Sequence, residues 1–308
     1  MEKSTVLGVS RPLVTGATLV VFAAVVLGGC ISGSSSSVLP IDDAPEDAER
    51  AASSSLPDSP GLAIEVTRVT DGDSLRATSS EGDLEIRLLG INAPESNECF
   101  GSESSDRLAA LLDDSMITLH PWPGERDEFG RQLGFLVAGE TLVNLALVES
   151  GHVLARAQSN HGFEREFEEA ETSAAADELG LWAPDACGDP VDAEVVFSEV
   201  FENAPGDDRQ NPNGEYVILT NEGDADIDLE GWTLRDESTR HRFTFPSLTV
   251  APNADVQVRT GCGDDDLEAA PMQVFWCDPR PPVWNNDGDT AFLLDPTGAI
   301  ADKFVIRG

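Results

Sequence analysis

The stretch that decides the fold reads Val69-Thr-Asp-Gly-Asp-Ser-Leu-Arg76 and, after a short polar turn, Ile86-Arg-Leu-Leu-Gly-Ile-Asn-Ala-Pro-Glu95. Both parts contain an apolar run typical of a strand, and both carry carboxylates and arginine at one end of that run. Glycine between Asp71 and Asp73 lets the chain turn tightly and bring two oxygen ligands together. Carboxylates with an arginine at the end of a small sheet suit a metal ion that faces a phosphate.

Three blocks follow one another in this region: Asp71-Gly72-Asp73-Ser74, Arg87-Leu88-Leu89-Gly90-Ile91-Asn92-Ala93-Pro94-Glu95 and Asp127-Glu128-Phe129-Gly130-Arg131. In their order and spacing they resemble the thermonuclease (staphylococcal-nuclease-like) family. The resemblance spans about residues 62–182.

The resemblance implies an enzyme that hydrolyses phosphodiester bonds of DNA or RNA with Ca²⁺ as cofactor. In that reading Arg87 and Arg131 bind the phosphate and Glu95 activates the attacking water. The residues implied as metal site are Asp73, Asn92, the carbonyl of Ala93 and, in a supporting position, Asp71.

Two positions depart from the family pattern. Asn92 stands where the family mostly has aspartate, which gives the metal one carboxylate fewer. Phe129 replaces a tyrosine and removes a hydroxyl group. A rival hypothesis therefore remains, namely a catalytically inactive nuclease-like module that binds nucleic acid or serves in adhesion.

The hydrophobic pattern predicts an α+β fold for residues 61–188. Three strands in a meander are expected between residues 62 and 90, and two more over residues 116–120 and 133–138. Helices are expected over residues 102–113, 142–151 and around 163–174, with Ser102 or Ser104 as the cap of the first. Five strands and three helices in this order indicate an OB-like barrel.

Residues 191–308 change in character, because short alternating runs recur between Gly, Pro, Asn and Asp. This pattern predicts an all-β sandwich of about seven strands. Three segments resemble the lamin-tail domain, an immunoglobulin-like sandwich. They are residues 214–217, 228–234 and 284–289.

The formal net charge is −38, from 57 acidic and 19 basic residues. At ordinary salt such a chain repels nucleic acid, whereas in molar salt the Debye length shrinks to about 3 Å. Because the chain is also 40% hydrophobic and well patterned, disorder does not explain the charge. The composition favours a halophilic source.

The N-terminus indicates export. Lys3 and Arg11 precede an uncharged run, residues 12–29, that is too short for a comfortable spanning helix and suits a signal peptide over residues 1–29. The run ends Leu27-Gly28-Gly29-Cys30, which resembles a lipobox and predicts lipidation of Cys30; an uncleaved anchor is the alternative. Residues 30–60, rich in Ser and acidic residues, predict a flexible linker.

We therefore expect an extracellular lipoprotein that is tethered to the membrane, with an unknown envelope partner for the C-terminal domain. In that oxidising space the remaining cysteines would form disulfides. Cys99–Cys187 and Cys262–Cys277 is the economical pairing among the three that four cysteines permit. A zinc site is less favoured, since no Cys-X2-Cys spacing occurs.

Overall fold

The computed structural model describes Leu56 and residues 61–113, 115–127, 129–156, 161–189, 191, 193–238 and 240–307. These residues all belong to one compact unit, Ala51–Gly308. The predicted signal peptide, Cys30 and all of the predicted linker except Leu56 lie outside the described residues. In the described part of the chain, no helix has both the length and the apolar character that a membrane crossing needs.

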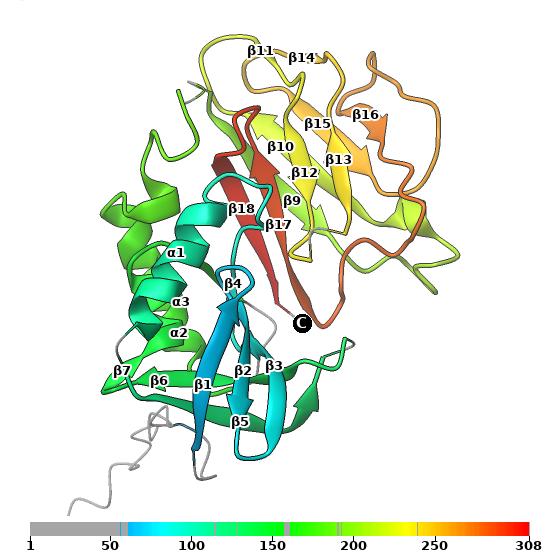
Figure 1. The fold of residues 1–308 in the computed structure, drawn as a ribbon. Coiled ribbons are helices and arrows are strands. Elements are labelled where there is room, and N and C mark those ends of the chain that lie inside the picture. Colours follow the sequence, from blue (N-terminus) through cyan, green and yellow to red (C-terminus); the bar gives the residue numbers. More distant parts are fainter. Residues whose placement is uncertain are drawn as a thin grey trace, which may run out of the picture. The chain divides into compact units, whose positions relative to one another are not determined.

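The first half is a closed five-stranded barrel with three helices, as the sequence predicted (Figure 1). In the barrel β1 pairs with β2 and β5, and β3 closes it by pairing with β6 in parallel, with Arg87 opposite Leu133. The bounds are β1 Leu62–Val69, β2 Ser74–Ser79, β3 Gly82–Leu88, β5 Ile117–Arg126 and β6 Gln132–Ala138, with a short β7 Thr141–Leu142 added at the edge.

The helices are α1 Gly101–Leu112, α2 Val143–Glu149 and α3 Glu164–Ala176, followed by the 3₁₀ turn η1 Gly180–Trp182. Their apolar faces close the barrel core, where Leu108, Phe135, Leu147 and Phe167 are at most 1% exposed. Leu56, near the end of the predicted linker, also packs against this core.

The predicted cap of α1 is wrong. Phe100, in the left-handed region at φ 65°, occupies the cap position without a side-chain hydrogen bond, and Ser104 is fully buried. The chain approaches so closely here that a Cβ on Gly101 would lie 2.1 Å from the carbonyl oxygen of Glu95. The start of α1 is therefore set by the tight turns that lead from Glu95 to Gly101 and not by a serine cap.

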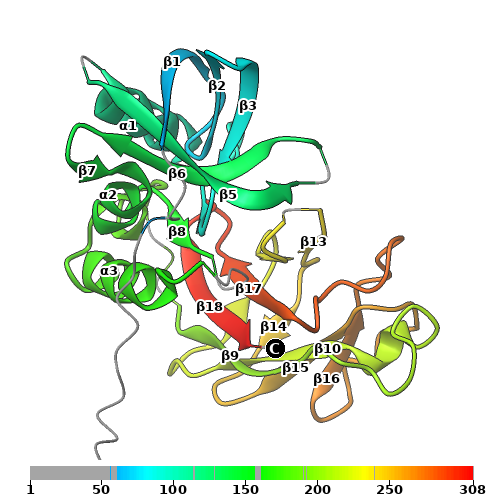
Figure 2. The same ribbon diagram turned by 90° about the horizontal axis from the view of Figure 1, so that it is seen from below.

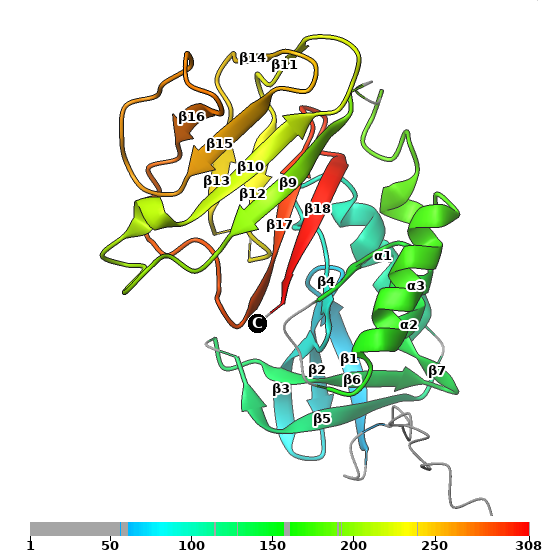
Figure 3. The same ribbon diagram turned by 180° about the vertical axis from the view of Figure 1, so that it is seen from behind.

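The second half consists of two four-stranded sheets and a small two-stranded one. In the first sheet β16, β15, β10 and β9 lie side by side, and in the second β13, β12, β17 and β18 do so (Figures 2 and 3). The bounds are β9 Val195–Phe201, η2 Pro212–Gly214, β10 Tyr216–Asn221, β11 Ile227–Asp228, β12 Thr233–Arg235, β13 Arg242–Thr244, β14 Thr249–Val250, β15 Asp255–Arg259, β16 Met272–Phe275, β17 Gly288–Leu294 and β18 Ile300–Arg307.

This β-rich half agrees with the predicted immunoglobulin-like sandwich. Its core holds Trp232, Trp284, Leu234 and Val256, each at most 1% exposed. The sheets contain more strands than the predicted seven, because the short β11, β14 and β16 and the C-terminal β18 were not recognised as strands. In β18 most positions are half-buried on both faces, so the sequence lacks the strict alternation that marks a strand.

An apolar cluster joins the barrel part to the sandwich part. Leu154 and Leu181 from the first half pack with Phe292 and Leu294 from the second, all at most 7% exposed. Ion pairs flank the cluster, and one of them joins Lys303 to Glu171. Leu154 belongs to β8 Leu154–Ala155, which pairs with β4 Ile91–Asn92.

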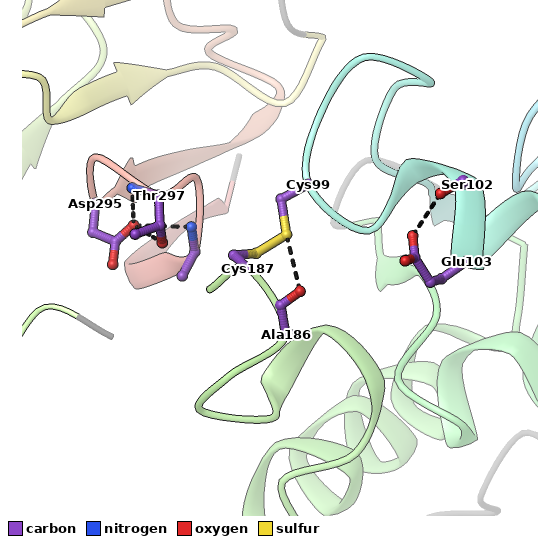
Figure 4. Close-up of a disulfide and its surroundings, with 8 residues drawn as sticks. Cys99, Ser102, Glu103, Ala186, Cys187, Asp295 and Thr297 are labelled. Carbon is purple, nitrogen blue, oxygen red and sulfur yellow. Dashed lines mark hydrogen bonds between the residues drawn. A yellow bond between two sulfur atoms is a disulfide. The ribbon is translucent and has the colours of Figure 1, made fainter. Parts of the chain in front are cut away.

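Two disulfides are present, Cys99–Cys187 and Cys262–Cys277, the pairing that the sequence favoured. The first joins the segment before α1 to the segment after η1, across a sequence separation of 88 (Figure 4). The second spans a separation of 15 within the sandwich. A cross-link that closes a longer loop removes more entropy from the unfolded chain.

We expect the Cys99→Ser/Cys187→Ser variant to lose more stability than the Cys262→Ser/Cys277→Ser variant. Loop-closure entropy predicts losses of about 4–5 and about 3 kcal/mol in the free energy of unfolding. Denaturant unfolding in molar salt measures both losses. An equal loss in the two variants would contradict the entropic explanation.

Candidate active site

A buried carboxylate, Asp73, lies at the centre of the site, just before β2. Asp73 is 5% exposed. Its Oδ1 accepts a hydrogen bond from the Ser74 hydroxyl (2.8 Å), and its Oδ2 accepts from the backbone N–H of Ala93 (2.7 Å) and from Nη2 of Arg87 (2.9 Å). Burial, which outweighs the attraction of Arg87, raises the pKa of Asp73 to about 6. Asp73 thus links the start of β2 to Arg87 on β3 and to Ala93, which follows β4.

Close approach, not a positive φ, explains the glycine between the two aspartates. A Cβ on Gly72 would lie 1.8 Å from the Ser104 hydroxyl and 2.8 Å from the Cβ of Ala93. Only glycine therefore lets this turn lie against α1 and against the segment that follows β4. Asp71 stabilises the turn, because its Oδ1 accepts the backbone N–H of Asp73 (3.0 Å).

Arg87, on β3, is held firmly by the protein. Its Nη1 donates to the carbonyls of Leu88 (2.7 Å) and Ile91 (2.8 Å), and its Nη2 donates to Asn92 Oδ1 (3.2 Å) as well as to Asp73. A guanidinium has five N–H donors, so four of them are used here. In this arrangement Arg87 offers a phosphate its charge and one remaining donor.

Arg131, at the end of the β5–β6 connection, has more donors to spare. Its Nε donates to Asp127 Oδ2 (2.5 Å) and its Nη1 to the Ser74 hydroxyl (3.0 Å). Since that hydroxyl donates to Asp73, one chain of hydrogen bonds joins Arg131 to the buried carboxylate. The guanidinium also lies against the Phe129 ring, 5.5 Å from its centroid. Arg131 is the better placed of the two arginines for a forked contact with phosphate.

Glu95 follows β4 and is exposed. It lines the same pocket as the two arginines, together with Asp71, Asp73 and Asn92. Partial burial raises the pKa of Glu95 above its usual value, and the charges of Asp71 and Glu98 add to this. A carboxylate with a raised pKa beside two guanidinium groups suits a general base.

The predicted metal ligands are oxygen atoms, which suit a hard cation. Two of them, on Asp73 and Asn92, already contact the guanidinium of Arg87. Among the described residues, no group of three or more His, Cys, Asp or Glu could hold a metal. The predicted set needs only Asp71, Asp73, an amide and a carbonyl oxygen. Asp73 Oδ2 has two donors and is saturated, whereas Oδ1 has a single donor in the described part of the chain and keeps a lone pair. A cation would compete with Arg87 for Asn92 Oδ1.

Comparison with known proteins agrees with this geometry. The profile of the family described as staphylococcal nuclease homologue matches residues 85–184, and that of the lamin tail domain matches residues 189–307. Micrococcal nuclease of Shigella flexneri is 30% identical over 135 residues, which cover 41% of this chain and 76% of that protein. The chain belongs to the staphylococcal nuclease family.

Further relatives of this family match over the same region. An uncharacterized endonuclease of Escherichia coli O157:H7 is 33% identical over 96 residues, which cover 31% of this chain and 61% of the relative. Thermonuclease of Staphylococcus hyicus is 27% identical over 127 residues, covering 38% and 74%. The predicted order of a nuclease-like domain and a lamin-tail domain is confirmed. The barrel is called the nuclease domain below.

The structure offers a reason for asparagine at position 92. Its Oδ1 accepts from Arg87, which fixes the orientation of the amide, and its Nδ2 donates to the backbone carbonyl of Glu237 (3.1 Å) in the lamin-tail domain. An aspartate could not make this second bond. The departure from the family pattern therefore coincides with the point where the second domain contacts the site.

Sequence reasoning missed the residues that the lamin-tail domain brings to the site. Arg156 and Glu237 form an ion pair (Nε to Oε2, 3.2 Å) in which the Glu237 side chain is 4% exposed. Five residues of the β12–β13 connection line the same pocket as Arg87 and Glu95. They are Asp236, Glu237, Ser238, Arg240 and His241. Their local sequence carries no motif, so only the docking of the two domains identifies them.

We expect Arg156→Ala to lower the free energy of unfolding by about 1–3 kcal/mol, because it leaves a buried carboxylate without its counter-charge. Adding Glu237→Gln should recover part of this loss. A double-mutant cycle measured by denaturant unfolding gives the coupling energy.

The exposed pair Arg76–Glu85 (2.7 Å) is the matched control, and its cycle should yield at most about 0.5 kcal/mol. Equal coupling in both cycles would show that the contact between Arg156 and Glu237 does not hold the domains together.

Proposed function

We propose that the nuclease domain hydrolyses phosphodiester bonds of DNA or RNA, with Ca²⁺ as cofactor. One observation carries this proposal: a single pocket is lined by Arg87, Glu95 and Arg131 around the buried Asp73. The similarity to a micrococcal nuclease and to a thermonuclease supports it.

Each side chain has a distinct task in this reaction. Glu95 accepts a proton from the water that attacks phosphorus, which requires it to be ionised. Arg131 contacts the phosphate through its spare N–H groups, and Arg87 adds charge from the opposite side of Asp73. Negative charge grows on the phosphate oxygens during the reaction, so both guanidinium groups stabilise the transition state more than the substrate.

Asp73, Asn92 and the carbonyl of Ala93 would hold the cation, with Asp71 supporting them. Bound there, calcium would polarise the phosphate and lower the pKa of a water. Two N–H groups of Arg87 are committed to Asp73 and Asn92 in this structure. If a cation took these oxygens, the two N–H groups would be free to donate to a phosphate.

We further propose that the chain acts outside the cell, tethered to the membrane through a lipid on Cys30, in a halophile. The net charge of −38 supports the halophilic setting, because repulsion between protein and nucleic acid fades in molar salt. An extracellular setting supplies calcium at concentrations that a site with one carboxylate fewer tolerates. Degradation of external nucleic acid is then a plausible duty.

We expect Glu95→Gln to reduce kcat by about 100- to 10,000-fold, and Arg87→Ala and Arg131→Ala to reduce it by about 100- to 1,000-fold each. Exposed residues of the same type, in Glu81→Gln and Arg76→Ala, serve as controls and should change kcat by less than about twofold. Digestion of a labelled oligonucleotide in molar salt, with calcium or with chelator, measures the effect.

The wild-type rate should also fall as the pH drops through the raised pKa of Glu95, because the protonated carboxyl cannot accept a proton. Failure of the wild type to cleave, while it still binds the oligonucleotide, would favour the non-catalytic binding module.

We expect Asp73→Asn to weaken calcium binding by about tenfold or more, because the change removes the charge of the central carboxylate. A tenfold change corresponds to about 1.4 kcal/mol of binding free energy. Arg87→Ala should tighten calcium binding by about tenfold, because a competing positive charge leaves the ligands. Isothermal titration calorimetry measures both, with Arg76→Ala as the control. Loss of calcium binding in Arg87→Ala would instead show that this arginine holds the ligands in place.

A further inference from the structure

In the β12–β13 connection of the lamin-tail domain, the described residues 236–238, 240 and 241 are anchored by several hydrogen bonds, and they are called the turn below. Asp236 and His241 exchange backbone and side-chain hydrogen bonds across it, and the Ser238 hydroxyl donates to Asp236. The backbone N–H of Glu237 donates to the buried Asp289 on β17 (3.2 Å). The turn is therefore fixed to the sandwich core.

The same turn is also fixed to the nuclease domain. Glu237 accepts from Asn92 through its carbonyl and pairs with Arg156 through its side chain. Beyond the turn, Arg242 on β13 forms an ion pair with Glu98. The apolar cluster of Leu154, Leu181, Phe292 and Leu294 described above supports these polar contacts. The turn thus lies beside the catalytic residues as a structured wall.

Between this wall and the catalytic residues lies a pocket of about 700 Å³. Its barrel side holds Arg87, Glu95 and Arg131, and its sandwich side holds the turn and Pro282. Ligand pockets of about 300–1,000 Å³ enclose a drug-sized molecule. The space therefore matches one or two nucleotides and not a duplex.

Arg240 is the residue of the turn with the chemistry for a nucleic-acid strand. It is exposed, and its guanidinium carbon lies 5.7 Å from the centroid of Phe129. The guanidinium carbon of Arg131 lies 5.5 Å from the same centroid. Phe129 is itself 68% exposed. Two guanidinium groups from different domains thus flank one exposed aromatic ring.

We propose that the lamin-tail domain supplies the second wall of a cleft for a single nucleic-acid strand, in which Arg240 binds a phosphate next to the one bound by Arg131. This role rests on the proposed nuclease function. Forked guanidinium donors match phosphate oxygens, and the Phe129 ring, over which both guanidinium groups lie, holds the two near each other. The hydrogen bond from Asn92 to Glu237 joins the two walls beside the pocket.

The first test measures binding of a fluorescein-labelled single-stranded oligonucleotide by anisotropy, with chelator present so that nothing is cleaved. Arg240→Ala should weaken binding about tenfold, and the slope of log K against log salt should fall by about 0.7, the value for one phosphate contact of a single strand. Arg240→Lys should restore the slope because it restores the charge.

Arg209→Ala is the matched control, an exposed arginine of the same domain that pairs with Asp207 and does not line the pocket. It should change neither the affinity nor the slope. Equal binding by Arg240→Ala and Arg209→Ala, or a weaker affinity with an unchanged slope, would overturn the phosphate contact.

The second test compares cleavage of the oligonucleotide with cleavage of the same sequence annealed to its complement. We expect kcat/KM for the single strand to exceed that for the duplex by at least about tenfold, since a duplex must first open at a cost of about 1.4 kcal/mol per step. Equal values would overturn the closed cleft. A wild type that cleaves neither substrate refutes the proposed nuclease function, whereas the binding test still judges Arg240.

Discussion

The buried carboxylate of Asp73 is the constraint on which the site depends. It accepts hydrogen bonds from Ser74, from the backbone of Ala93 and from Arg87, and through Ser74 it also reaches Arg131. A buried charge is tolerated only when it is paired and hydrogen-bonded, so these partners must adopt their positions for the domain to fold. The requirement that stabilises the barrel also places the two arginines on either side of one carboxylate.

The two arginines are therefore not equivalent, although the resemblance assigns both of them to the phosphate. Arg87 is enclosed and donates to two carbonyls and two side chains, whereas Arg131 keeps donors that face the pocket. This difference follows from position, because Arg87 lies within a strand that closes the barrel and Arg131 lies in a connection. The hydrogen bonds thus tie Arg87 to the predicted oxygen ligands and leave Arg131 with donors for a phosphate.

The lamin-tail domain enters the same network through a backbone carbonyl and one carboxylate of Glu237. Its contact with Asn92 explains a residue that, from the sequence alone, was expected only to weaken the predicted metal site. In a chain with a net charge of −38, the pocket brings four arginines together with six carboxylates. Attraction of a phosphate to this pocket therefore depends on direct contacts with individual guanidinium groups and not on a net positive field.

The sequence by itself determined the barrel and the sandwich, because strand alternation is a local property of the chain. Through its resemblance to a known family it also predicted Arg87, Glu95 and Arg131 as site residues, and the structure places all three at one pocket. The sequence could not determine the start of α1, the saturation of Arg87 or the role of the β12–β13 turn. Each of these depends on which groups meet once the chain has folded: the carbonyl of Glu95 at Gly101, four acceptors at one guanidinium, and Glu237 at Asn92. Tertiary structure decided them, since a hydrogen bond between domains leaves no periodic signal in either segment.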